Sequence, residues 1–192
     1  EINGKISFHY QLVNNLKLIK TIMPSMEERL LLENWTIENH GDSTVQFSVA
    51  SSQLQLNEKG YKGNYAFRVS TDCDENEKFS ISANQSVSFN VLYSAEIDDE
   101  GINLSADENM QSRDKYLKMC QDNLILETPD ATLNQLFYFA KIRAAESIFE
   151  SSMGLVHSPG GGNYYVGIWA NDQVEYSGPF FPYLGYDRGG RA

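Results

Sequence analysis

Apolar and polar residues alternate with a period of two through most of the first 100 residues. The alternation runs through KISFHYQ (5–11), LKLIKTIM (16–23), RLLLENWTIEN (29–39), TVQFSVA (44–50), NYAFRVS (64–70) and SVSFNVLYSAEI (86–97). Because successive side chains of a strand point to opposite faces, each segment is predicted to be a strand with one apolar face. Turn-forming residues separate these strands: Asn14-Asn15, HGDS (40–43), Glu58-Lys59-Gly60 and DCDENEK (72–78). Residues 1–104 are therefore predicted to form an antiparallel β-sandwich.

The period changes to that of a helix after residue 98. Asp98-Asp99-Glu100-Gly101 ends the last predicted strand. The segment DENMQSRDKYLKMCQDN (107–123) then has helical spacing at Met110, Arg113, Leu117 and Cys120. This spacing predicts a linker helix over 105–125.

The longest helical pattern is LETPDATLNQLFYFAKIRAAESIFESSMG (126–154). Thr128 is a suitable N-cap, Pro129 suits the first helical position, and Gly154 is a suitable left-handed C-cap. The predicted apolar face of this helix consists of Leu133, Phe137, Ala140, Ala144 and Ile148. A helix of about 24 residues is typical of a helical domain. We therefore expect an α+β chain in which 126–192 opens a helical domain, with one more helix starting at Pro179 or Pro182 and the remainder of the domain outside this sequence.

Charge and cysteine content limit the partners that this chain can have. It has 192 residues, with 15 Lys+Arg against 26 Asp+Glu and a formal charge of −11. Such a charge disfavours nucleic acid and anionic membrane surfaces. No apolar stretch approaches the roughly 20 residues of a membrane span. Two cysteines without metal-ligand spacing predict neither a disulfide framework nor a metal site, and no cofactor is expected.

The stretch GGGNYYVGIWANDQVEYSGPFFPYLGY (160–186) holds the densest candidate chemistry. Aromatic rings stack on the apolar face of a sugar, and glycoside hydrolysis uses two carboxyl groups. Trp169, Asp172 and Glu175 therefore suit a sugar-binding loop. The alternative is a packed turn, in which the Asn171-Asp172 pair caps the next helical turn. His157 is expected to stabilise this loop through a hydrogen bond or to contact a substrate, and Phe180 and Phe181 are expected to be structural.

Two segments of this sequence resemble the six-hairpin glycosidases, which are bacterial glycoside hydrolases. They are LETPDATLNQLFYFAKIRAAESIF and GLVHSPGGGNYYVGIWANDQVEYSGPFFPYLG. The resemblance implies an N-terminal β-supersandwich followed by the first helix and loop of an (α/α)6 toroid. It also implies that Trp169 and Asp172 line the subsite for the sugar to be cleaved. A secreted or periplasmic location follows from the same resemblance. Another catalytic carboxylate would lie in the part of the toroid outside this chain, so the chain alone is expected to be inactive.

Together, these observations predict a glycoside hydrolase acting on an oligo- or polysaccharide, with residues 157–176 lining the sugar subsite. Asp172 is the first catalytic candidate and Glu175 the second. The substrate-binding candidates are His157, Tyr164, Tyr165, Trp169, Asn171 and Tyr176. One alternative is a polysaccharide lyase with Tyr165 or His157 as base, which the acidic charge disfavours. The other is a non-catalytic module for carbohydrate binding or domain assembly.

Overall fold

The computed structural model describes residues 4–50, 53–151, 154–158 and 167–184. The chain forms two compact units, unit 1 (residues 1–114) and unit 2 (residues 115–192). The boundary between them falls within helix α1 (Ala106–Asp122). Each unit has its own architecture.

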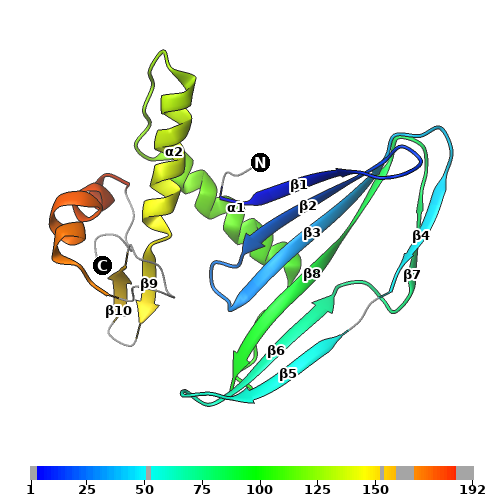
Figure 1. The fold of residues 1–192 in the computed structure, drawn as a ribbon, viewed down its shortest axis with the longest axis horizontal. Coiled ribbons are helices and arrows are strands. Elements are labelled where there is room, and N and C mark those ends of the chain that lie inside the picture. Colours follow the sequence, from blue (N-terminus) through cyan, green and yellow to red (C-terminus); the bar gives the residue numbers. More distant parts are fainter. Residues whose placement is uncertain (1–3, 51–52, 152–153, 159–166, 185–192) are drawn as a thin grey trace. The chain divides into compact units, whose positions relative to one another are not determined.

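Unit 1 is built on a six-stranded antiparallel sheet with the order β1-β2-β3-β8-β6-β5 (Figure 1). Its strands are β1 (Ile6–Gln11), β2 (Leu16–Pro24), β3 (Leu30–Asn39), β8 (Ser86–Ile97), β6 (Asn64–Thr71) and β5 (Leu54–Lys59). A second antiparallel sheet pairs β4 (Val45–Val49) with β7 (Glu77–Ile81). The tight turn between β1 and β2 places Asn14 and Asn15 at φ 56° each, as a hairpin turn with two left-handed positions requires.

The cross-strand register places most of the apolar side chains of the large sheet on one side. Phe8 pairs with Lys20, Lys20 with Trp35, and Trp35 with Phe89, so these four residues share that side. We call it the apolar face; its apolar members are Ile6, Phe8, Tyr10, Leu16, Leu18, Ile22, Leu31, Trp35, Ile37, Leu54, Leu56, Tyr65, Phe67, Val69, Val87, Phe89, Val91, Tyr93, Ala95 and Ile97. The opposite side is joined by polar pairs such as Asn34–Asn90 at 2.9 Å and Thr36–Ser88 at 2.8 Å, and we call it the polar face.

The small sheet begins a second layer over the apolar face. Phe79 in β7 stacks with Phe47 in β4 at 5.2 Å between ring centroids, and reaches Phe89 of the large sheet at 6.1 Å. One end of the polar face carries the core cluster Met23, Leu30, Leu32 and Leu92, against which Ala106 and Met110 of α1 pack. The fold class is therefore α+β, with an antiparallel β-sandwich followed by helices, as predicted.

All six predicted strands are present, but two further strands were missed. β5 ends in Glu58 and Lys59, which were interpreted together with Gly60 as a turn. β7 begins at Glu77, inside the stretch 72–78 that was also interpreted as a turn. The charges of Glu77 and Lys78 hide this strand, because only its pairing with β4 selects the extended conformation.

The linker helix is confirmed as α1, and the residues that predicted it lie on its buried side. Arg113 is 2% exposed and Cys120 is 3% exposed, while Leu117 is also buried. Arg113 donates from Nε to the backbone carbonyl of Gly4 at 3.2 Å, which ties α1 to the start of unit 1.

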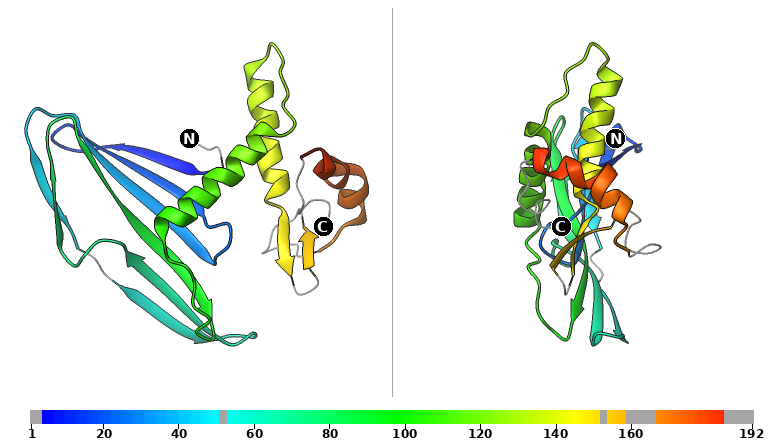
Figure 2. Two further views of the ribbon diagram at one scale, coloured as in Figure 1. Left: turned by 180° about the vertical axis from the view of Figure 1, so that it is seen from behind. Right: turned by 90° about the vertical axis from the view of Figure 1, so that its left-hand side faces the viewer.

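Unit 2 contains less helix than the sequence predicted. It contains α2 (Ala131–Ala145), β9 (Ile148–Ser151), β10 (Gly154–His157), the π-helix η1 (Asp172–Tyr176) and the 3₁₀ helix η2 (Gly178–Leu184). Figure 2 shows the antiparallel hairpin of β9 and β10 directly after α2. Over the described residues, no helix has both the length and the apolar character needed to cross a membrane.

The predicted start of the long helix was wrong by two residues. Asp130 is the N-cap, and its Oδ1 accepts hydrogen bonds from Thr132 N at 2.8 Å and Leu133 N at 3.2 Å. Thr128 instead bonds to the side chain of Asn134, with its Oγ1 donating to Asn134 Oδ1 at 2.8 Å. A carboxylate at the cap also interacts favourably with the helix dipole, which favours Asp130 over Thr128.

The predicted end was wrong by about eight residues. α2 stops at Ala145, and Ile148 then pairs with His157 in the hairpin, so Gly154 opens a strand instead of capping a helix. Gly154 has φ 103°, a conformation that favours glycine in a turn as well as at a C-cap. The predicted apolar face lies only partly on the helix, because Ile148 belongs to β9. Leu133 and Ala140 are exposed, whereas the buried residues are Lys141, Ile142 and Ala145 near the C-terminal end.

Candidate functional site

The acidic and aromatic residues of 167–184 lie on a π-helical turn followed by a 3₁₀ helix. Ser177 N donates to the carbonyl oxygen of Asp172 at 3.0 Å, which is the i to i+5 bond of a π-helix. Single π-turns of this kind are rare and frequently occur at functional sites. Gly178 ends the turn, and a Cβ there would lie 1.8 Å from the carbonyl oxygen of Gln173. Only glycine therefore fits where η1 meets η2.

Both candidate acids lie on η1. Asp172 is half-buried and Glu175 is exposed. Within the described part of the chain, neither carboxylate has a hydrogen bond or an ion pair. Both are therefore available to accept a hydrogen bond from a sugar hydroxyl or, when protonated, to donate a proton to a leaving-group oxygen.

Aromatic side chains flank these acids and face solvent. Trp169 is 52% exposed and Tyr176 is 66% exposed. Ile168, Val174 and Tyr183 add further exposed apolar surface to the same segment. Asn171 precedes η1 but its side chain makes no capping hydrogen bond, so the alternative of a simple cap does not account for it. A group of exposed apolar side chains beside unpaired acids is typical of a binding surface.

His157 and Gln173 connect this turn to the hairpin. Gln173 Nε2 lies 2.9 Å from His157 Nδ1 and 3.1 Å from the backbone oxygen of His157. The carbonyl can only accept, so Nε2 is the donor, and the neighbouring Nδ1 must accept as well. The neutral imidazole therefore carries its proton on Nε2. The loop-stabilising hydrogen bond expected of His157 is present, and a direct contact with substrate stays a prediction.

The Nε2–H group of His157 is buried without an acceptor among the residues that the structure describes. The side chain is 1% exposed, and its ring meets the edge of Phe181 at 4.9 Å between centroids. Phe181 is itself 1% exposed, and Phe180 contacts Phe137 of α2 edge-on at 6.3 Å. Both phenylalanines thus hold η2 in unit 2, as predicted.

The structure brings Trp169, Asn171, Asp172, Glu175 and Tyr176 together on one short segment and links it to His157 through Gln173. Tyr164 and Tyr165 lie in 159–166, outside the described residues. Sequence reasoning missed Gln173, which no motif marks, and Gly178, whose position before Pro179 was an available break signal. Over the described ranges, no group of three or more His, Cys, Asp or Glu side chains could hold a metal ion.

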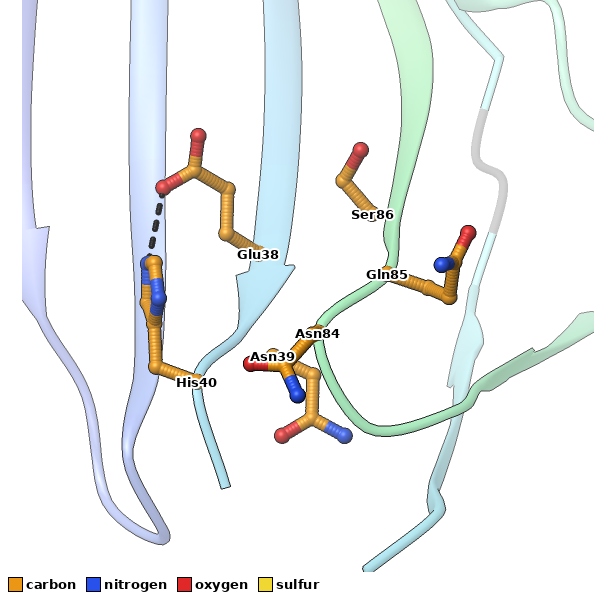
Figure 3. Close-up of a pocket in the computed structure, with 6 residues that line it drawn as sticks. All are labelled: Glu38, Asn39, His40, Asn84, Gln85 and Ser86. Carbon is orange, nitrogen blue, oxygen red and sulfur yellow. Dashed lines mark hydrogen bonds and ion pairs between the residues drawn. The ribbon is translucent and has the colours of Figure 1, made fainter. Parts of the chain in front are cut away.

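A separate polar hollow of about 390 Å³ lies in unit 1 (Figure 3). It is lined by Glu38, Asn39, His40, Asn84, Gln85 and Ser86. A hydrogen bond from His40 at 3.0 Å is the main cause that lowers the pKa of Glu38, and the charge of Lys17 adds to it. The single carboxylate is thus already paired, and no second one lines the hollow. It therefore lacks the two carboxyl groups that glycoside hydrolysis uses.

Comparison with known proteins gives a likeness among solved structures but none in sequence. No protein family matches the sequence, and no curated protein matches it either. Among solved structures, the chain is similar to a human-microbiome protein provisionally named a kojibiose phosphorylase, with 13% identity and a TM-score of 0.47. The match covers 76% of this chain and 26% of the other. A likeness at this level assigns no activity, and the chain spans about a quarter of the length of that protein.

Proposed function

We propose that this protein is a glycoside hydrolase and that residues 157–176 form one wall of its sugar subsite. The observation that carries the proposal is the π-helical turn, which presents Asp172 and Glu175 without partners among the described residues beside the half-exposed ring of Trp169. Pyranose rings are recognised by this combination, because the aromatic ring covers their apolar face while carboxylates accept from their hydroxyl groups.

In this proposal Trp169 stacks on the sugar and Tyr176 adds a second exposed ring. Asp172 acts on the glycosidic bond, and Glu175 binds a hydroxyl or assists Asp172. Gln173 is a positioning residue, because its two hydrogen bonds to His157 fix the turn that carries both acids. Glycoside hydrolysis needs a second carboxyl group at a defined separation from the first. We propose that another part of the whole protein supplies it if Glu175 does not.

Hydrolysis of aryl glycosides and oligosaccharides by the protein in its full natural length tests the proposal. Asp172→Asn should reduce kcat by a factor of at least about 100, the lower range for losing a general acid or base. Trp169→Ala should mainly raise KM, since stacking contributes to binding in both ground and transition states. Asp42→Asn, which changes an exposed acid in a turn of unit 1, is the matched control and should leave both parameters unchanged.

Two outcomes contradict this assignment. Sugar binding without turnover would favour the non-catalytic module. Cleavage that produces the ultraviolet absorbance of an unsaturated uronate would favour a lyase. Running the same assay with and without inorganic phosphate shows whether water or phosphate accepts the glycosyl group.

A further inference from the structure

Within the described residues of unit 1, the apolar face of the six-stranded sheet is covered at one end only. The β4–β7 sheet lies over Phe89 through Phe79. Away from that contact the face is open on both flanks. Phe8 and Tyr10 on β1 are 42% and 44% exposed, and Leu54 and Leu56 on β5 are 66% and 53% exposed. A sandwich sheet normally packs this side against a second layer about 10 Å away.

The open surface approaches the area that one partner buries in a standard protein interface. Eight large apolar side chains of this face are 38–66% exposed, from Ile6 on β1 to Phe67 on β6. With about 150–250 Å² available per aromatic side chain, they leave roughly 600–700 Å² open. The largest apolar patch of an ordinary monomer is about 300–600 Å². A standard interface buries about 800 Å² on each partner.

The electrostatics of this face define what can cover it. Its central charges are Lys20 and Glu33, which pair at 3.2 Å. Trp35 Nε1 donates to the other oxygen of the same carboxylate at 2.9 Å. The remaining charge, Glu58, lies at the end of β5. The centre of the face is therefore neutral in a chain of charge −11, and burying it leaves no unpaired charge there.

We propose that a second copy of this chain covers the apolar face, with the two sheets packed face to face about a two-fold axis. A two-fold interface brings one surface against itself, which suits a neutral, apolar and sheet-shaped surface on both sides. The uncovered flanks of the two copies would meet, and the layer that β4 and β7 begin over each face would be continued by the partner. This assembly does not depend on the sugar site, so either proposal can fail without the other.

The mass of the 192-residue chain in solution, measured by light scattering and sedimentation equilibrium, tests the proposal. We expect a mass of twice the 21.7 kDa chain at micromolar concentrations. Phe8→Lys and Leu56→Lys place a charge on the two open flanks, and each should weaken dimerisation at least tenfold. Both positions are exposed, so neither change disturbs the interior of the sheet.

The matched controls are His9→Lys and Gln55→Lys. These exposed neighbours lie on the same strands, but their side chains point to the polar face. They should leave the dimer intact, and circular dichroism should show the same β content in all four variants. A monomer at up to about 100 μM would overturn the proposal, and so would a dimer that Phe8→Lys and Leu56→Lys leave unchanged. Dissociation by the control variants to the same extent would also overturn it.

Discussion

Lys141 should be among the most important residues for the stability of unit 2. Its side chain is 2% exposed, yet it carries an ammonium group. Its Nζ donates to the carbonyl oxygens of Gln121 at 3.3 Å, Asn123 at 2.6 Å and Leu124 at 3.0 Å. These carbonyls lie at and just after the C-terminus of α1, where a helix leaves its last acceptors unsatisfied. The buried ammonium group of Lys141 on α2 therefore provides hydrogen-bond donors for the carbonyl groups at the end of α1.

Lys141→Met keeps an unbranched apolar stem and removes all three donors. Each buried acceptor left without a partner costs about 1–3 kcal/mol. Two effects offset part of this cost. The folded variant no longer buries a charge, and water can replace the lysine as a donor to carbonyl groups that lie near the surface. We therefore expect the free energy of unfolding of unit 2 to fall by about 2–4 kcal/mol, the range for breaking a buried polar network.

Urea unfolding followed by tryptophan fluorescence measures this change. The chain has two tryptophans, Trp35 in unit 1 and Trp169 in unit 2. A Trp35→Phe background leaves Trp169 as the reporter of unit 2. With a slope of about 1–2 kcal/mol/M, the midpoint should fall by roughly 1–4 M at unchanged slope. The control is Lys118→Met, because Lys118 is exposed and forms a surface ion pair with Asp122 at 2.8 Å, and it should cost less than about 1 kcal/mol. A loss at Lys141 no larger than at Lys118 would refute the reasoning.

The difference in unfolding free energy between the wild type and Lys141→Met should depend on pH, and the pKa of Lys141 gives the direction. Burial lowers the pKa of Lys141 below its usual 10.5, with Cys120 and Asp122 partly opposing the shift. Between the lowered value and 10.5 the unfolded chain binds more protons than the folded chain, so stability rises with pH. The difference in unfolding free energy between the wild type and Lys141→Met should therefore grow as the pH approaches 10.5. A constant or shrinking difference contradicts the direction of the shift.

Two further substitutions and one measurement of thiol reactivity test other parts of the structure. Gly178→Ala should displace η1 and abolish sugar binding, because the new Cβ would lie 1.8 Å from the carbonyl oxygen of Gln173; loss of the His157–Gln173 hydrogen bond in NMR spectra checks this. Asp130→Ala should cost about 1 kcal/mol in urea unfolding, with Asp130→Asn recovering most of it, since both caps accept from backbone N–H groups. Burial, with the acids around it, raises the pKa of Cys73 to about 11 from 9.0. The thiol should therefore react with a disulfide reagent near neutral pH about tenfold more slowly than in the unfolded chain, because the loss of thiolate is partly offset by its greater nucleophilicity. An equal rate would contradict the shift.

Most strands could be predicted because the alternation of apolar and polar residues lies within each strand itself. In β1 and β8 the period of two follows from one face being apolar, and the structure places their alternating apolar residues on that face. In β3 the apolar positions change face, since Leu30 and Leu32 lie on the polar face while Trp35 and Ile37 lie on the apolar face. β7 was not readable in the same way. Its residues are charged at Glu77 and Lys78, and it is extended because Phe79 pairs with Phe47 more than 30 residues earlier in the chain. Pairing over that separation leaves no periodic signal in the strand itself.

The long helix was overextended for a similar reason. Residues 146–151 favour a helix locally, but β9 pairs with β10 through Ile148 and His157, a contact that helical spacing cannot reveal. The candidate site was found through residue types, since Trp169 and Asp172 suit sugar chemistry wherever they lie. Their support was not found, because the role of Gln173 depends on the position of His157 sixteen residues away.

The most direct test of the proposed sugar site is a fluorescence titration of Trp169 in the Trp35→Phe background with neutral oligosaccharides. An indole that is 52% exposed should change its emission when a sugar ring stacks on it, with saturation in the millimolar range or tighter. Asp172→Asn should weaken the response and Asp42→Asn should not. An emission spectrum that no oligosaccharide of the panel alters would contradict the account.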